Sequence, residues 1–228
     1  NAADGGKTYS SSPLLSDDPN SVFFIDDESV ILSTDDGKII KYNYKLCGIE
    51  WERLSCLPDV YGESVEALST FEDSGNRYFF WGDGSGNIGI LGDRGKDISR
   101  SKIDGTVDCC EIDHASKQVF CGLSNGKLVA INLPDLKLLR QTEAHSSAIK
   151  SIAITNKQEI MTCSYDNVLK VSDVKLREIL KYSITENSQR GWSRGLAINP
   201  TNENEYVITS LGDAPLVVFR NDTKIAPR

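Results

Sequence analysis

A histidine and an aspartate near the middle of the chain have the side chains of a general base and of the carboxylate that orients such a base. His145 precedes Asp166, and the hydroxyls of Thr162 and Ser164 are close to the aspartate in the sequence. A histidine between a carboxylate and a hydroxyl can activate a nucleophile, as in serine hydrolases. We expect neither a serine with the surroundings of a nucleophile elbow nor a group that supplies an oxyanion hole, however. We therefore expect His145 and Asp166 to be structural, with hydrogen bonds around a turn.

Three other kinds of residue cluster bind metals or phosphates in many proteins. The acidic clusters are Asp17-Asp18, Asp26-Asp27-Glu28 and Asp35-Asp36. They lack the calcium-loop pattern, and the glycine-rich stretch Gly82–Gly86 lacks the helix start or the Lys-Ser/Thr that a phosphate cradle needs. The six cysteines form no Cys-x-x-Cys pair, and His114 and His145 complete no zinc pattern. We expect no cofactor, no metal and reduced thiols, although Cys110 and Cys121 could meet across a hairpin.

The residues around His145 and Asp166 lie in short runs that alternate between apolar and polar side chains. Ala144–Asp173 contains three such runs, separated by a polar turn and by a tight Asp-Asn turn. Alternation with period 2 is typical of antiparallel strands with one half-buried face. The pattern recurs about every 42 residues. Its successive starts are Ser21, Ser64, Thr106, Ala148 and Trp192. Such a period predicts an all-β propeller with five recognisable four-stranded blades.

The repeat divides the chain into a short lead-in and one large domain. Residues 1–20 are rich in Gly, Ser, Asp and Pro, so we expect a flexible lead-in, or a ring-closing strand at Lys7–Ser12. Residues 21–228 are expected to form the propeller. Hairpin turns are predicted at Asp35–Gly37, Gly84–Gly86 and Ser124–Gly126, where glycine permits a tight turn. The fourth strand of the third unit is expected at Leu136–Gln141.

Ala144–Asp173 resembles a WD40 repeat. Ala144-His145 stands where that family usually has Gly-His, and Ser164–Asn167 stands at its Ser-x-Asp-Gly turn. Ser172-Asp173 stands at the terminal Trp-Asp, with serine in place of tryptophan. The other units keep the spacing and the apolar pattern alone. The resemblance implies a hydrogen-bonded network of His145, Asp166 and a hydroxyl from Thr162 or Ser164, without the tryptophan that usually completes it.

Propellers of the resembled family usually have seven blades, so five units leave several explanations open. The chain could be a fragment of a longer protein, part of a seven-bladed ring, or a five-bladed ring in its own right. Segments could also be missing, or a partner could donate a blade. An open ring would expose unpaired sheet edges, which promote aggregation.

The resemblance also implies where a partner would bind. Two positions in each blade of that family often contact partners, one early in the first strand and one just before the aspartate of the turn. The first corresponds to Phe23, Glu66, Asp108, Lys150 and Arg194. The second corresponds to Asp35, Gly84, Ser124, Tyr165 and Gly212. The stretch Arg190–Arg194 adds Arg190 and Trp192, and we expect it at the channel mouth because Trp, Tyr and Arg dominate interface energetics. The alternative is that Trp192 packs over a neighbouring blade. Trp51 and Trp81 lie within strand patterns, and we expect them in the core or between blades.

Composition narrows the classes of function. The 228 residues carry a formal net charge of −8 at pH 7, which argues against direct binding of nucleic acid. No apolar run is long enough for a membrane span, and the first residues lack the pattern of a signal peptide. We therefore expect an intracellular protein of the cytoplasm or the nucleus.

The function that the resemblance implies is that of a non-catalytic scaffold for protein–protein interaction, a subunit of a larger intracellular complex. The alternative is a peptide-recognition module, such as a substrate receptor of a ubiquitin ligase. The adaptor signal Trp-Asp-x-Arg is absent, because Ser172–Lys175 keeps only the aspartate. A propeller hydrolase is a third hypothesis, which the two histidines disfavour. The expected partners are other protein subunits or a short peptide motif, and we expect no enzyme activity.

Overall fold

The computed structural model describes residues 18–46, 48–54, 63–184, 192–199, 201–202, 205–211, 216–220 and 223–225. These residues form strands and turns, and none of them lies in a helix. The strands are β1 Pro19–Phe24, β2 Ser29–Thr34, β3 Lys38–Asn43, β4 Gly48–Leu54, β5 Val65–Asp73, β6 Asn76–Asp83, β7 Asn87–Gly92, β8 Asp97–Lys102, β9 Val107–Asp113, β10 Gln118–Leu123, β11 Lys127–Asn132, β12 Leu138–Glu143, β13 Ile149–Ile154, β14 Ile160–Ser164, β15 Val168–Ser172, β16 Glu178–Ser183, β17 Trp192–Ile198, β18 Glu205–Leu211, β19 Leu216–Arg220 and β20 Thr223–Ile225.

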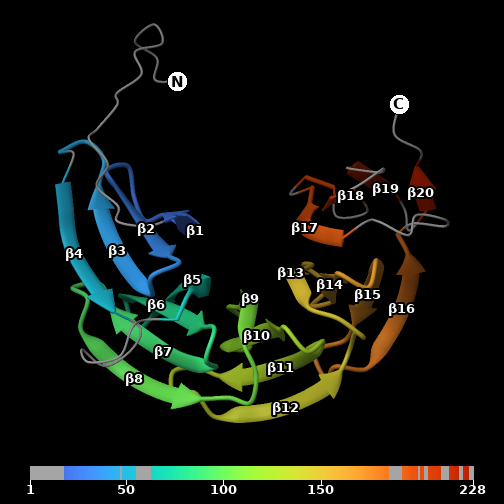
Figure 1. Ribbon diagram of the computed structural model, residues 1–228, viewed down its shortest axis with the longest axis horizontal. Helices are drawn as coiled ribbons and strands as arrows, with labels where there is room; N and C mark the ends of the chain where they lie inside the picture. Colours follow the sequence, from blue (N-terminus) through green and yellow to red (C-terminus); the bar gives the residue numbers. More distant parts are fainter. Residues whose placement is uncertain are drawn as a thin grey trace, which may run out of the picture.

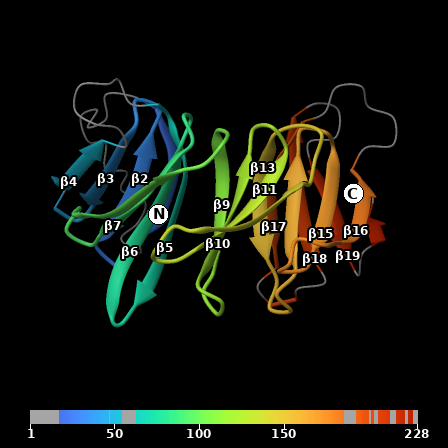
Figure 2. The ribbon, with the colours of Figure 1, turned by 90° about the horizontal axis from the view of Figure 1, so that it is seen from below.

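Consecutive strands pair antiparallel in groups of four. The resulting sheets, which we number 1 to 5 in chain order, are β1–β4, β5–β8, β9–β12, β13–β16 and β17–β20. They follow one another around an arc, with sheets 1 and 5 at its two ends (Figure 1). The first strand of each sheet lies on the inner side of the arc and the fourth on the outer side (Figure 1). Seen from below, the strands run between the two broad faces of the arc, where the turns lie (Figure 2).

The core consists of apolar layers between consecutive sheets. Ile31 and Ile39 of sheet 1 pack with Phe79 and Trp81 of sheet 2, and all four are at most 1% exposed. Three further clusters join sheets 2 and 3, sheets 3 and 4, and sheets 4 and 5 in the same way. Sheets 2, 3 and 4 therefore bury both of their faces, which explains why their middle strands are nearly continuous apolar runs in the sequence.

Glycine residues permit the close packing around Trp81 and the tight hairpins between the second and third strands. A side-chain carbon on Gly89 of β7 would lie 2.4 Å from the Trp81 ring, so the small residue creates the space that this tryptophan fills. The hairpins between second and third strands place Gly37, Gly86 and Gly126 at φ values of 80°, 79° and 84°. L-residues with a side chain rarely adopt this region, and the fourth hairpin uses Asn167 there instead, at 59°.

The all-β prediction, with four-stranded antiparallel sheets, is confirmed for the described residues. The expected strand at Leu136–Gln141 was wrong by two residues, because Leu136 lies in a tight turn at φ 56° and β12 begins at Leu138. Strand β1 begins at Pro19, two residues before the predicted start of the first unit at Ser21. The expected strand at Lys7–Ser12 lies outside the described residues.

Candidate partner-binding site

The inner wall of the arc is built by the first strands of the five sheets. β1 contacts β5, β5 contacts β9, β9 contacts β13, and β13 contacts β17. Residues at the same early position of each strand therefore lie side by side, although about 42 residues separate them in the sequence. This brings Glu66, Asp108, Lys150 and Arg194 together.

Lys150 joins three of these strands. Its Nζ lies 3.1 Å from Oε2 of Glu66 in β5 and 3.4 Å from Oδ1 of Asp108 in β9. The side chains of Lys150 and Asp108 are only 13% and 6% exposed. Burial raises the pKa of the Asp108 carboxyl above its ordinary value, against the opposing attraction of Lys150. Burial alone would lower the pKa of Lys150, but the carboxylates of Asp108 and Glu66 hold it above its ordinary value. The ammonium therefore stays charged between two acids.

Tyr165 connects this ion triad to the fifth sheet. It lies in the turn between β14 and β15, and the Lys150 Nζ is 5.6 Å from the centre of its ring. The Nε–H of Arg194 donates to the Tyr165 hydroxyl at 2.9 Å, and the guanidinium carbon is 5.9 Å from the ring centre. The Trp192 ring lies 5.8 Å from the Tyr165 ring, centre to centre, and 58% of Trp192 is exposed. We call Tyr165, Trp192 and Arg194 the aromatic–arginine cluster.

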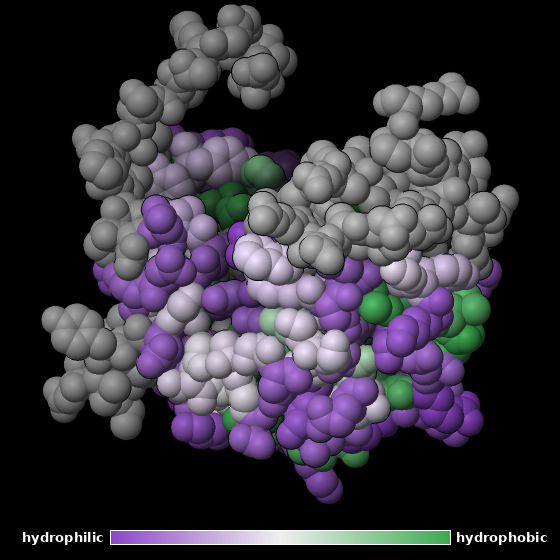
Figure 3. All heavy atoms as spheres, turned by 45° about the vertical axis from the view of Figure 1, so that its right-hand side comes forward, coloured by the Kyte–Doolittle hydropathy of each residue, from purple (hydrophilic) through white to green (hydrophobic). Residues whose placement is uncertain are grey.

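An open depression of about 340 Å³ lies against Arg194 of this cluster. Phe23, Glu66, Asp108, Lys150 and Arg194, the five residues assigned to the first partner position, all line it. Phe23 is 39% exposed there. In a space-filling view, hydrophobic surface is visible in the hollow between the two ends of the arc, beside hydrophilic surface (Figure 3). The depression thus combines apolar and charged groups, as protein interfaces do.

The other residues predicted to contact a partner are those at the second position of each unit and Arg190. Asp35 accepts hydrogen bonds from Asn20 Nδ2 at 2.7 Å and from Ser64 Oγ at 3.1 Å, so it links sheets 1 and 2. The backbone N–H groups of Gly84 and Ser124 donate to Ser64 and Thr106 at the start of the unit to which each belongs. Arg190 and Gly212 lie outside the described residues.

The two other tryptophans were expected in the core or between blades. Trp81 is 1% exposed, between sheets 1 and 2. The Trp51 side chain lies outside the described part of the structure.

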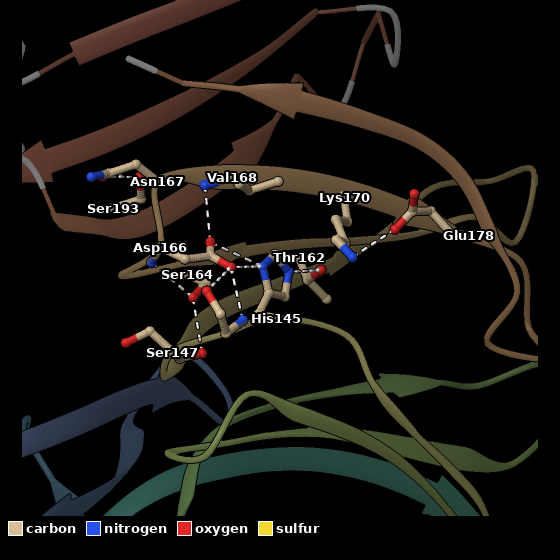
Figure 4. A network of polar contacts seen from close by, with 11 residues as sticks. His145, Ser147, Thr162, Ser164, Asp166, Asn167, Val168, Lys170, Glu178 and Ser193 are labelled. Atoms are coloured by element: carbon tan, nitrogen blue, oxygen red, sulfur yellow. Dashed lines mark hydrogen bonds and ion pairs between the residues drawn. The ribbon is translucent and has the colours of Figure 1, made fainter. Parts of the chain in front are cut away.

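His145 and Asp166 form a closed hydrogen-bond network (Figure 4). His145 Nδ1 lies 3.0 Å and 3.1 Å from the two Asp166 carboxylate oxygens, and Nε2 lies 2.8 Å from the Thr162 hydroxyl. These partners assign the proton to Nδ1, which donates to the carboxylate, while Nε2 accepts from Thr162. The hydroxyl of Ser164 bonds elsewhere, donating to the Ser147 carbonyl at 3.0 Å. Of the two candidate hydroxyls, Thr162 therefore bonds the imidazole.

The same carboxylate also closes the turn. Asp166 accepts from the backbone N–H groups of Ser146 at 3.1 Å and of Val168 at 3.0 Å. Burial by itself would raise the pKa of Asp166, but the hydrogen bonds from His145 and the backbone hold it below its ordinary value. The imidazole is 0% exposed and both of its nitrogens are occupied. This arrangement stabilises a hairpin and leaves no nitrogen of His145 free to act on a substrate.

A Gly-x-Ser-x-Gly spacing does occur at Gly122–Gly126, with Ser124 at its centre. It lies in the hairpin between β10 and β11, whereas a nucleophile elbow joins a strand to a helix. Within the described residues no group of three His, Cys, Asp or Glu side chains could hold a metal ion. None of the described residues lies in a helix long and apolar enough to cross a membrane.

The described thiols are free. Cys110 and Cys121 do pair across the β9–β10 hairpin in register, yet both are free cysteines, as are Cys109 and Cys163. Burial raises the pKa of each of these thiols, to about 12 for Cys163, so they are poor nucleophiles.

The sequence interpretation missed one carboxyl group on the inner wall. Burial raises the pKa of Glu111 in β9 to about 7. The available signal was a glutamate within the run Val107–Ile112, in which Asp108 is the only other charged residue.

Comparison with known proteins finds no family model that matches the chain and no curated protein that matches it.

Proposed function

We propose that the chain is a WD40-like β-propeller, with its five sheets as blades, that acts as a non-catalytic scaffold for protein–protein interaction within a larger complex. Repeated four-stranded antiparallel sheets around an arc support the fold. The partial WD40 pattern of Ala144–Asp173 supports the family.

The aromatic–arginine cluster is the observation that carries the proposed function. Trp192 is 58% exposed although it is a large aromatic residue, and its ring packs on Tyr165. The Tyr165 hydroxyl in turn accepts a hydrogen bond from Arg194, which lines an open depression. Rigid aromatic side chains next to an arginine are the usual centre of a protein interface, because they bury a large area at low entropic cost. A scaffold uses such a surface without any bond being made or broken.

The test compares proteins captured from cell extract by the wild-type chain, by the double variant Tyr165→Ala/Trp192→Ala, and by Leu46→Ala. Leu46 is 81% exposed in the turn between β3 and β4, so its variant controls for the loss of an exposed apolar side chain. We expect a stoichiometric companion that the wild type and Leu46→Ala retain and the double variant loses. Equal capture by all three would contradict a partner site at this cluster.

A further inference from the structure

Arg194 has hydrogen-bond donors that point to the chemistry of the partner. Its Nε–H is used by the Tyr165 hydroxyl, at 2.9 Å. A guanidinium carries five N–H donors, of which four are on the two terminal nitrogens. Between described residues, no ion pair involves Arg194, and Tyr165 is the acceptor of its one hydrogen bond. The terminal N–H groups are therefore available on the wall of the depression.

Lys150, the other cation of the depression, is not available in this way. Its ammonium is shared between Glu66 at 3.1 Å and Asp108 at 3.4 Å, and the side chain is 13% exposed. The two carboxylates are occupied by the same contacts. A ligand that enters the depression thus meets one accessible cation among the described residues, the planar fork of Arg194.

The orientation of that fork is fixed before a partner arrives. The hydrogen bond to Tyr165 and the position over its ring hold the guanidinium, and the tyrosine is itself placed between Lys150 and Trp192. A planar guanidinium matches a carboxylate with two parallel hydrogen bonds, and a fixed side chain loses little entropy on binding. Trp192, which packs on the same tyrosine, exposes an apolar face.

We propose that the depression binds a partner segment through a carboxylate that accepts hydrogen bonds from Arg194, with an adjacent apolar side chain packed on Trp192. The inference rests on the proposed function and adds the chemical class of the partner segment, namely an acidic residue beside an apolar one. A neutral or basic residue in place of the acid leaves the terminal donors of Arg194 without a charged acceptor.

The test is a titration of the full chain, labelled with ¹⁵N, with the peptide acetyl-Phe-Asp-Leu-amide. Its matched controls are the same peptide with Asn or with Lys in place of Asp. The readouts are the side-chain N–H signals of Arg194 and Trp192. We expect saturable shifts of both signals with the Asp peptide at millimolar concentration, and at least about tenfold weaker binding of the Asn and Lys peptides.

Two variants separate charge from geometry. Arg194→Gln is expected to lose the preference for Asp over Asn, and Arg194→Lys is expected to keep only part of it, because an ammonium lacks the fork. Arg177→Gln is the control, since Arg177 is an exposed arginine already paired with Asp173. Equal affinity for the Asp and Asn peptides, no saturable shift up to about 10 mM, or an unchanged preference in Arg194→Gln would each overturn the inference.

The two proposals can fail separately. If the companion captured from extract is lost in Tyr165→Ala/Trp192→Ala but retained in Arg194→Gln, the scaffold function stands and the carboxylate inference is wrong. If the Asp peptide binds as expected and no companion depends on the cluster, the inference stands and the scaffold function is wrong.

Discussion

The ammonium of Lys150 lies 3.4 Å from the carboxylate of Asp108, and both side chains are largely removed from solvent. The two residues belong to neighbouring inner strands, β13 and β9, and Glu66 extends the contact to β5. The pair orders the wall of the depression, because removing Lys150 leaves the buried carboxylate of Asp108 without this cation.

Replacement of Lys150 is therefore expected to destabilise the fold. Lys150→Met keeps most of the side-chain volume but leaves Asp108 without its cation, and we expect a loss of roughly 2–3 kcal/mol in the free energy of unfolding. Urea unfolding followed by fluorescence measures this loss. Lys127→Met is the control, because its two carboxylate contacts, at 3.8 Å, are to exposed acids, and its loss should be much smaller. Equal losses in the two variants would show that the buried pair has no special role.

The double variant Lys150→Met/Asp108→Asn tests whether the two side chains are energetically coupled. With Asp108→Asn in place, no charge remains at position 108 to be left unpaired, so the second substitution is expected to recover part of the stability lost in the first. Urea unfolding of the two single variants and the double variant measures the coupling between them. Losses that simply add would mean that the two side chains act independently.

The strands could be predicted from the sequence because each has period-2 alternation bounded by turn residues. Ser29–Thr34 and Lys38–Asn43 are found with the predicted bounds, since the Asp-Asp-Gly turn between them fixes both ends. Leu136 was misplaced because a leucine at positive φ leaves no signal in an apolar pattern. The early positions of the first strands could be named from the 42-residue repeat and the family resemblance.

The contacts between those positions could not be predicted. Glu66 and Lys150 are 84 residues apart, and an ion pair between them depends on how neighbouring sheets are rotated and offset. Likewise, the sequence left Thr162 and Ser164 as equal candidates for the His145 network. Only the register of β14 against the Ser147 loop shows that Thr162 bonds the imidazole.

Glu111 provides a prediction on pH. Its pKa is raised to about 7 in the folded chain by burial, above the value near 4.3 of an unfolded glutamate. The folded state therefore binds this proton more tightly, which stabilises the fold below about pH 4 and is lost as the pH rises through 7. Glu111→Gln removes the cost of burying the charged carboxylate. We expect it to raise the free energy of unfolding at pH 8 by roughly 1–2 kcal/mol while changing it little at pH 4. Urea unfolding at both pH values, with the exposed Glu143→Gln as control, measures the difference. A gain of the same size at both pH values would exclude the burial of a charge as its cause.

The network around Asp166 predicts the opposite pH dependence, because its contribution to stability is lost in acid. Its pKa is lowered in the folded chain, so its contribution to stability is present above the unfolded pKa and is lost as the pH falls through the folded pKa. Asp166→Ala removes the acceptor for His145 and for two backbone N–H groups, and we expect a loss of about 2–4 kcal/mol at pH 7 that shrinks in acid. Thermal unfolding from pH 7 down to pH 3 measures this trend. Asp27→Ala, at an exposed position between β1 and β2, is the control and should change stability little. A loss that does not depend on pH would contradict the proposed role of the carboxylate.

Substitutions at Gly126 and Gly75 distinguish two effects of an added side chain, the backbone strain at positive φ and the steric clash with neighbouring atoms. Both have positive φ, 84° and 75°, so a side chain is strained at either position. An added carbon on Gly126 would lie 2.1 Å from the His145 carbonyl oxygen, whereas one on Gly75 meets nothing within 4 Å. Gly75→Ala is expected to cost about 1 kcal/mol, and Gly126→Ala about 3 kcal/mol or more, because the start of the fourth unit must move away from the β10–β11 hairpin. Urea unfolding of the two variants measures the difference, and hydrogen exchange at His145 reports the displacement. If both substitutions had the same effect, the close approach of these two segments would not limit the residue at position 126.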